Sequence, residues 1–224
     1  KNHQNFRLQK KRPELILAKK HDNFILPVPT GFGMTANKNF YFSHMLNCIY
    51  DCKYCFLQGL YSSANFVLFV NYEDFFKSIL GLRKVDKCSS MSFFSGYDCD
   101  SLAFDKISGF ADKALDFFGQ NPDLELELRT KSIATRALLK REPISNCIVA
   151  FSLSPANIAD ALDRRAPSIR KRIKMIKKLA KHGWKIGLRF DPLIYCSGWE
   201  KLYGELFENI FRGLDNNDVH SVSF

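Results

Sequence analysis

Short, mainly apolar runs and amphipathic stretches alternate along most of the chain. The apolar runs cover six to eight residues each, a length typical of strands, and six are present: 39–46, 91–96, 124–130, 147–153, 185–190 and 219–224. Six stretches between them have a helical pattern: 51–60, 72–82, 103–118, 133–141, 169–182 and 199–213. Because helices separate the strands, the pattern predicts parallel strands joined by right-handed crossovers.

The number of units predicts the architecture. Six βα units make an α/β fold of the partial (βα)6 TIM-like barrel type, since a complete barrel has eight units and takes roughly 250 residues. The sixth strand pattern ends at Phe224, and the helix expected after it is missing. We therefore expect an N-terminal extension over 1–37, with turn formers such as Gly31 and Gly33, and a partial barrel over 38–224 that is truncated at its C-terminus.

The composition argues against a membrane or secreted protein. Hydrophobic residues make up 46% of the 224 residues and charged residues 25%, which is enough to form a packed core. The apolar stretch 66–70 is far too short to cross a bilayer. The first residues are polar and have no apolar segment typical of a secretory signal. We expect a cytoplasmic monomer that does not bind a membrane.

The positive charge is concentrated in one segment. The formal net charge is +10, and the range 164–199 holds eleven Lys or Arg and one acid, Asp191, so it carries the whole excess. The helix predicted over 169–182 has one apolar stripe and basic residues on its other faces. Those faces are either a phosphate-contacting surface or the solvated outside of a barrel helix. The second interpretation is favoured because such helices flank the barrel wall rather than its mouth.

Three cysteines form the strongest motif in the sequence. Cys48, Cys52 and Cys55 have the spacing C-x3-C-x2-C directly after the first predicted strand, and four further cysteines are scattered. Three thiolates from one loop can bind three irons of a 4Fe–4S cluster and leave the fourth iron open for a ligand. The alternative is a zinc site completed by His44 or by a remote cysteine. Zinc ligands usually come as two pairs, and the sequence has no second pair, so the spacing favours the cluster.

This loop resembles the radical S-adenosylmethionine (AdoMet) superfamily, and its wider context resembles the spore photoproduct lyase family. The specific part is the range 40–59, with the sequence FYFSHMLNCIYDCKYCFLQG. Shorter matches follow in the same order: SGYDCDSLA at 95–103, LRTK at 128–131, FSLS at 151–154, AKHGWKIGLRFDPLI at 180–194 and GWEKLY at 198–203. The resemblance spans about residues 27 to 224 and so covers most of the chain.

The resemblance implies a radical mechanism. The open iron would chelate the amino and carboxylate groups of AdoMet, and an electron from the reduced cluster would cleave AdoMet to methionine and a 5′-deoxyadenosyl radical. The radical would then abstract a hydrogen atom from C6 of a methylene-bridged thymine dimer, so the implied partner is DNA containing a thymine photolesion. A flavodoxin or ferredoxin type of protein would supply the electron.

The resemblance also implies roles for individual residues. Cys99 lies where the family has the cysteine that returns a hydrogen atom to the product radical, and Tyr54 is a second catalytic candidate. Four residues are candidates for binding AdoMet: Ser95, Gly96, Lys131 and Ser152. Simpler interpretations remain open. Cys99 could be a small buried residue, Lys131 an ordinary lysine of the barrel rim, and Ser152 a buried hydroxyl bound to the backbone.

One position departs from the family pattern. The family has a tyrosine directly after the last cluster cysteine, whereas this chain has Phe56, which has no O–H group to donate. This difference keeps another function open, that of a radical AdoMet enzyme acting on another substrate, RNA or peptide. A metal-bearing nucleic-acid-binding module without catalysis is an alternative of a different class.

Overall fold

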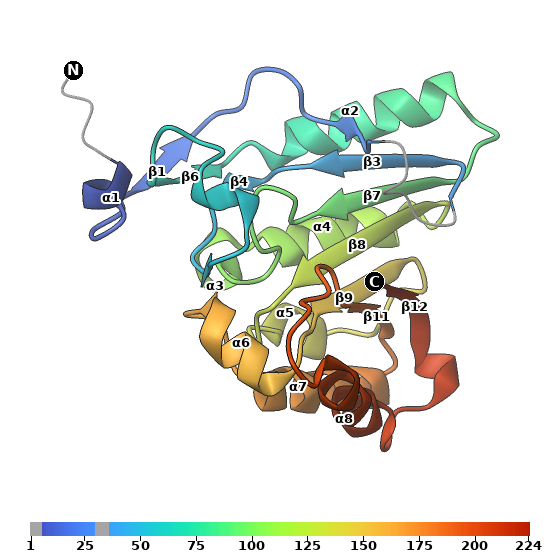
Figure 1. Cartoon of the computed structure of the whole chain (residues 1–224). Helices are drawn as coiled ribbons and strands as arrows, with labels where there is room; N and C mark the ends of the chain where they lie inside the picture. The colour runs from blue at the N-terminus through green and yellow to red at the C-terminus, as the bar shows by residue number, and fades with distance from the viewer. Residues whose placement is uncertain (1–5, 30–35) are drawn as a thin grey trace.

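The computed structural model describes residues 6–29 and 36–224, and its central layer is one open sheet (Figure 1). The strand order is β12-β11-β9-β8-β7-β3-β2. Six strands run parallel: β3 (Lys38–Phe42), β7 (Met91–Ser95), β8 (Leu124–Thr130), β9 (Cys147–Ser152), β11 (Lys185–Arg189) and β12 (Val219–Ser223). At one edge, β2 (Leu26–Pro27) pairs antiparallel with β3. The six parallel strands confirm the predicted partial barrel, which is not closed.

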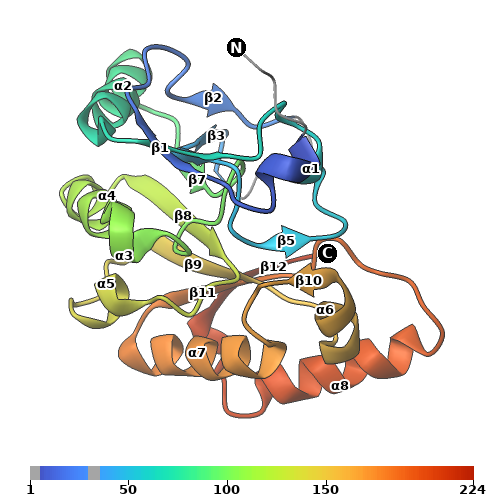
Figure 2. The same cartoon turned by 90° about the vertical axis from the view of Figure 1, so that its left-hand side faces the viewer.

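Helices cover the outer face of this curved sheet (Figure 2). They are α2 (Tyr72–Val85), α4 (Phe110–Gly119), α5 (Arg136–Leu139), α7 (Ile169–His182) and α8 (Trp199–Phe211). The main hydrophobic core lies between the two layers and includes the three leucines of β8 together with Phe110 and Phe118. The residues between those leucines, Glu125 and Glu127, face the inner side, because successive side chains of a strand point to opposite faces.

The basic helix predicted over 169–182 lies on the outside of the barrel wall, as the sequence analysis favoured. α7 is one of the outer helices, its apolar stripe joins the core, and most of its Lys and Arg side chains are exposed. Arg172 is the exception. It is 1% exposed, and its guanidinium binds the backbone oxygens of Pro167 and Ser152, at 2.8 and 3.0 Å. One cation of this helix therefore has a structural role inside the barrel wall.

A second, three-stranded sheet was not expected. It has the order β1-β6-β4 and consists of β1 (Leu15–Ala18), β6 (Phe66–Phe69) and β4 (Met45–Leu46). The strand predicted over 39–46 is wrong in its second half, because the chain leaves the main sheet after Phe42 and residues 45–46 pair with β6. The turn contains Ser43, whose hydroxyl donates to Asp98, and His44, which is buried against Phe110.

The helix predicted over 51–60 is also wrong. Asp51–Cys52 forms a short strand, β5, that pairs antiparallel with β10 (Asp163–Arg164), and only a single 3-10 turn, η1 (Phe56–Gln58), follows. The pairing with β10 uses backbone N–H and C=O groups that a helix would need for its own hydrogen bonds. The N–H of Lys53, for example, donates to the backbone oxygen of Leu162 (2.9 Å). This tertiary pairing overrides the local pattern.

The remaining differences concern element boundaries. The helix predicted over 103–118 is interrupted at Gly109, whose φ of +58° favours glycine, so that α3 (Asp105–Ser108) precedes α4. The helix predicted over 133–141 shortens to α5, and the sequence pattern missed α6 (Ala156–Leu162) and η2 (Asn216–Asp218). No helix in the described part of the chain is long and apolar enough to cross a membrane.

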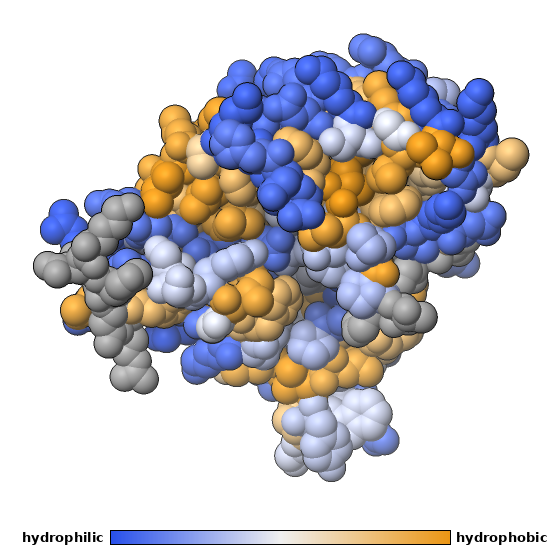
Figure 3. Space-filling view, turned by 90° about the horizontal axis from the view of Figure 1, so that it is seen from above, coloured by the Kyte–Doolittle hydropathy of each residue, from blue (hydrophilic) through white to orange (hydrophobic). Residues whose placement is uncertain are grey.

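The predicted N-terminal extension contributes to both sheets through β1 and β2, and the first element among its described residues is α1 (Phe6–Gln9). Its turn formers Gly31 and Gly33 lie outside the described residues. The face of the molecule drawn in Figure 3 mixes hydrophilic and hydrophobic residues. Among the exposed apolar side chains of the chain are Ile16 and Leu17 of β1, which are 42% and 65% exposed.

Candidate active site

A cavity of about 500 Å³ lies at the carboxyl ends of the parallel strands. Parallel barrels bind their ligands at this end, because the loops that follow the strands converge there. Seven of the nine predicted site residues line the cavity: Cys48, Cys52, Cys55, Gly96, Cys99, Lys131 and Ser152. The other two, Ser95 and Tyr54, are not part of its wall as far as the described residues define it. The structure thus brings together residues that lie up to 104 positions apart in the sequence.

The cysteine loop is fixed at both ends. Before it, Asn47 has a left-handed conformation (φ +66°), and its side-chain amide donates to the backbone oxygens of Ser63 and Asn65 at 2.9 and 2.7 Å. Within it, the N–H of Cys55 donates to the oxygen of Cys52 (3.1 Å) and closes a turn. The short β5–β10 ladder then holds Cys52 opposite Asp163.

The three thiols fit a cluster by their chemistry. Burial raises the pKa of Cys48 and raises that of Cys52 to about 12, so both are protonated thiols unless a metal binds and favours the thiolate. Among the described residues, no three His, Cys, Asp or Glu side chains converge on a point where a single metal ion would fit. A 4Fe–4S cluster does not require such convergence, because each cysteine binds a different iron. These three residues would hold that cluster.

His44, the candidate fourth ligand of a zinc site, packs against Cys99. Its Nδ1 lies 3.8 Å from the Cys99 Sγ, and its ring stacks on Phe110 with a centroid distance of 3.8 Å. Burial lowers the pKa of His44 to about 3, so the ring is neutral at pH 7. Cys99 itself is 4% exposed, and burial raises its pKa well above the ordinary value. The residue therefore presents an intact S–H group at the cavity wall.

Asp100 connects the loop after β7 to the end of β8. One of its carboxylate oxygens accepts from the Thr130 hydroxyl (2.6 Å), and the other accepts from the backbone N–H of Lys131 (2.6 Å). The same carboxylate also accepts from two N–H groups of its own loop, those of Leu102 and Ala103. Burial nevertheless raises the pKa of Asp100, since removal from water outweighs these bonds. Sequence analysis missed this connecting role of Asp100, for which the only signal was an acidic residue soon after the strand predicted over 91–96.

The candidate AdoMet-binding residues are placed differently from one another. Gly96 has a φ of +98°, and a Cβ there would lie 2.7 Å from the Ser101 hydroxyl and 2.9 Å from the Arg129 oxygen, so only glycine fits. The buried Ser95 hydroxyl hydrogen-bonds to that of Ser101 (2.7 Å) behind the cavity wall. Ser152 is half-buried at the end of β9, where it lines the cavity.

The Tyr54 side chain is bound to a residue outside the cysteine loop. Its hydroxyl donates to the Asp163 carboxylate (2.5 Å), which also forms a buried ion pair with Arg172 (2.8 Å). Burial and the Asp163 carboxylate raise the pKa of Tyr54. The Lys131 Nζ lies 5.6 Å from the centre of the tyrosine ring. Tyr54 therefore links the loop to α7 through Asp163 and Arg172.

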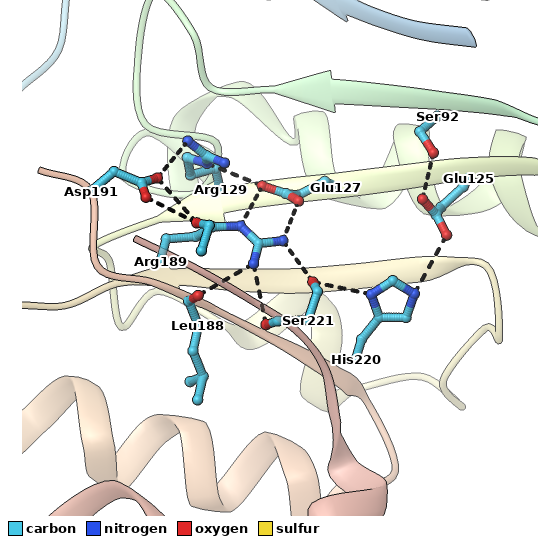
Figure 4. A network of polar contacts seen from close by, with 10 residues as sticks. Ser92, Glu125, Glu127, Arg129, Leu188, Arg189, Asp191, His220 and Ser221 are labelled. Carbon is cyan, nitrogen blue, oxygen red and sulfur yellow. Dashed lines mark hydrogen bonds and ion pairs between the residues drawn. The ribbon is translucent and has the colours of Figure 1, made fainter. Parts of the chain in front are cut away.

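A charged wall, formed by Glu127, Arg129, Arg189 and Asp191, lies on the inner face of the sheet (Figure 4). Glu127 accepts from the Arg129 Nε (3.0 Å) and from the Arg189 Nη2 (2.6 Å). The Arg129 Nη1 lies 3.5 Å from the Asp191 Oδ2. Arg129 points to the inner face whereas the neighbouring Thr130 turns to Asp100, as strand alternation requires. The sequence of β8 does not predict this wall, because an alternation of Glu and Leu is also typical of a strand with one face exposed to solvent.

The comparisons with known proteins agree with this geometry. A family model described as spore photoproduct lyase matches residues 38–224. Curated spore photoproduct lyases from a Geobacillus species and from Bacillus subtilis are each 25% identical over 178 residues, which is 79% of this chain and 52% of theirs. The chain thus spans about half the length of these relatives.

Solved structures show the same fold. A spore photoproduct lyase variant with bound AdoMet and dinucleoside spore photoproduct superposes with a TM-score of 0.83 at 22% identity, over 92% of this chain and 60% of that one. A spore photoproduct lyase complexed with dinucleoside spore photoproduct gives a TM-score of 0.81 at 22% identity, with the same coverage. Because the family model matches most of the chain, this protein belongs to the spore photoproduct lyase family.

Proposed function

We propose that this protein is a radical AdoMet lyase that restores two thymines from a methylene-bridged thymine dimer in DNA. The observation that carries the proposal is the gathering of three cluster cysteines, the Cys99 thiol and Lys131 around one cavity. The curated relatives, which are spore photoproduct lyases, support the same substrate. DNA containing the lesion and an electron donor of the flavodoxin or ferredoxin type are the proposed partners.

The cofactors proposed are a 4Fe–4S cluster on Cys48, Cys52 and Cys55, and AdoMet beside it. When bound together and reduced, they supply a 5′-deoxyadenosyl radical. The Lys131 ammonium is suited to bind the AdoMet carboxylate, because it lies on the cavity wall and its backbone is held by Asp100. The Ser152 hydroxyl offers a further hydrogen bond, and Gly96 lines the cavity in which AdoMet would bind.

Cys99 is the proposed hydrogen-atom donor to the product radical. Transfer of a hydrogen atom needs an intact S–H bond, and the raised pKa keeps this thiol protonated at neutral pH. Its apolar neighbours Met45 and Leu68 shield the thiol from solvent. Tyr54 is proposed as a second catalytic residue, with weaker support because its hydroxyl is already bound to Asp163.

Phe56 supports a second candidate function. It lines the cavity, is 60% exposed and has no hydroxyl at the position where the family has a tyrosine. An enzyme that does not use that hydroxyl could act by the same radical on RNA or on a peptide.

The test starts from protein purified and reconstituted without oxygen. We expect iron and acid-labile sulfide in the ratio of a 4Fe–4S cluster, AdoMet cleavage upon reduction, and conversion of lesion-containing DNA to thymine. AdoMet cleavage without any loss of the lesion would favour the second candidate. One zinc per chain and no sulfide would contradict both and leave a non-catalytic nucleic-acid-binding module.

A further inference from the structure

Arg129 and Asp191 form a donor–acceptor pair on the cavity wall. Arg129 comes from β8 and Asp191 directly follows β11, and their side chains are 34% and 36% exposed. The 3.5 Å between the Arg129 Nη1 and the Asp191 Oδ2 exceeds the length of an ordinary hydrogen bond. Each group therefore keeps hydrogen-bonding capacity for a molecule in the cavity.

Buried partners hold both members of the pair in place. Glu127, which is 2% exposed, binds the Arg129 Nε at 3.0 Å and is itself paired with the buried Arg189 at 2.6 Å. The Ser223 hydroxyl donates to the two carboxylate oxygens of Asp191, at 2.9 and 3.2 Å. Figure 4 shows the contacts of Glu127 with Arg129 and Arg189 along the inner face of the sheet. Such a fixed arrangement loses little conformational entropy when it binds a ligand.

The charge balance of the wall argues against an anion. Two guanidinium groups stand beside two carboxylates, so the formal charges cancel, and Arg129 lies between Glu127 and Asp191. A phosphate placed on Arg129 would be repelled by both acids. The wall instead suits a neutral group that offers an acceptor to Arg129 and, next to it, a donor to Asp191.

An aromatic ring lines the same cavity as the pair. Tyr97 lines the same cavity and stacks on Tyr41 with a centroid distance of 4.6 Å. Burial raises the pKa of Tyr97, and the positive charge of Arg129 opposes this rise. A flat ring in one cavity with a fixed donor and acceptor is an arrangement by which proteins read the edge of an extruded nucleobase.

We propose that Arg129 and Asp191 determine specificity by reading the imide edge of one thymine ring of the lesion. Arg129 donates to a ring carbonyl oxygen, and Asp191 accepts from the neighbouring N3–H. The inference rests on the proposed function, because it takes the thymine lesion as the substrate. It assigns to this wall a recognition role that is separate from the radical chemistry of the cysteine loop.

A methyl group on N3 tests this inference directly. The probes are two labelled oligonucleotides that carry the lesion, one with unmodified rings and one methylated at N3 of both rings. Binding to the cluster-loaded protein without reductant is measured by fluorescence anisotropy, so that no turnover occurs. We expect the native protein to bind the unmodified probe about tenfold or more tightly, because methylation removes the donor and leaves Asp191 unpaired.

Variants assign the preference to the pair. In Asp191→Ala the preference falls to about one, because no acceptor remains to be left unpaired. Arg129→Ala binds both probes about tenfold more weakly. The matched control is Glu125→Gln, which changes the other end of the same network, where Glu125 faces His220 at 3.7 Å and does not line the cavity. The control keeps the native preference.

The outcomes separate this inference from the proposed function. Lesion repair by a native protein that binds both probes equally overturns the inference and leaves the function standing. A clear preference for the unmodified probe without any repair supports the inference and counts against the function. Failure to bind either probe more tightly than undamaged DNA overturns both. The native measurements decide the matter even if a variant does not fold.

Discussion

The cysteine loop and two residues of the charged wall, Arg129 and Asp191, line the same cavity, but the loop and the wall are built in different ways. The loop places Cys48, Cys52 and Cys55 within eight residues and is held by a two-residue ladder, β5–β10. The wall joins Glu127 and Arg189, which are 62 positions apart, across three rigid strands. The difference separates two kinds of site. We expect the loop to lose its function without loss of the fold, whereas the buried ion pair of the wall should support the fold.

Removal of a loop cysteine gives the largest expected change in activity. For Cys55→Ala we expect loss of the cluster and AdoMet cleavage at the background rate, measured as iron and sulfide content and as methionine released. The free energy of unfolding of the metal-free variant should stay within about 1 kcal/mol of that of the metal-free native protein, because Cys55 is only half-buried and its side chain is not part of the core. The matched control is Cys88→Ala, which alters an exposed cysteine outside the cavity and leaves cleavage intact. A marked loss of stability in Cys55→Ala would contradict the comparison.

Cys99→Ala separates radical formation from product formation. We expect AdoMet cleavage to continue, because the cluster ligands are untouched, while thymine ceases to be the main product. Chromatography of the lesion products measures this change. Cys147→Ala is the control, since Cys147 is equally buried but belongs to the main core and not to the cavity. An unchanged product distribution in Cys99→Ala would remove its role as donor.

Breaking the buried ion pair of the wall should mainly affect stability. For Glu127→Ala we expect the free energy of unfolding to fall by about 3–5 kcal/mol, because Arg189, at 1% exposure, loses the carboxylate that neutralises its charge. Chemical denaturation of the metal-free protein measures this loss. A change below 1 kcal/mol would mean that the wall, like the loop, is not needed for the fold.

Acid should destabilise the folded protein through His44, which packs between Cys99 and Phe110. Its pKa in the folded protein is about 3, below the ordinary value of about 6.5, so the unfolded chain binds the extra proton. Its contribution to stability is complete above pH 6.5 and falls by about 1.4 kcal/mol per pH unit toward pH 3. The free energy of unfolding, measured by denaturation at several pH values in this range, should depend less on pH for His44→Phe, which keeps the stacking on Phe110. Equal slopes would contradict the assignment to His44.

Arg129→Ala should change stability least. Its side chain is one-third exposed, and Glu127 keeps its buried partner Arg189, so we expect a loss of less than about 1 kcal/mol. Thermal unfolding of the metal-free protein measures it. Together with the weaker lesion binding expected for the same variant, a small loss would mark Arg129 as the part of the wall that serves recognition.

Local patterns were enough to predict most of the main sheet. β8 matches its predicted bounds and β7, β9, β11 and β12 differ by one residue at one end, because buried parallel strands show as short apolar runs. α7 also matches, since its apolar stripe is regular. The predictions failed where distant segments compete for the same backbone, as at 45–46, which pairs with β6, and at 51–52, which pairs with β10.

The sequence by itself determined the order of the parallel strands in the main sheet, the three cysteines of the loop and the resemblance to a family of radical enzymes. Those features depend on residues that are close together in the sequence, so the covalent chain itself keeps them close in space. Only the tertiary structure decided that His44 contacts Cys99, that Asp100 braces Lys131, and that Arg129 and Asp191 meet at one cavity. These contacts join strands and loops whose separation is set by the packing of the whole sheet, and no local pattern records that distance.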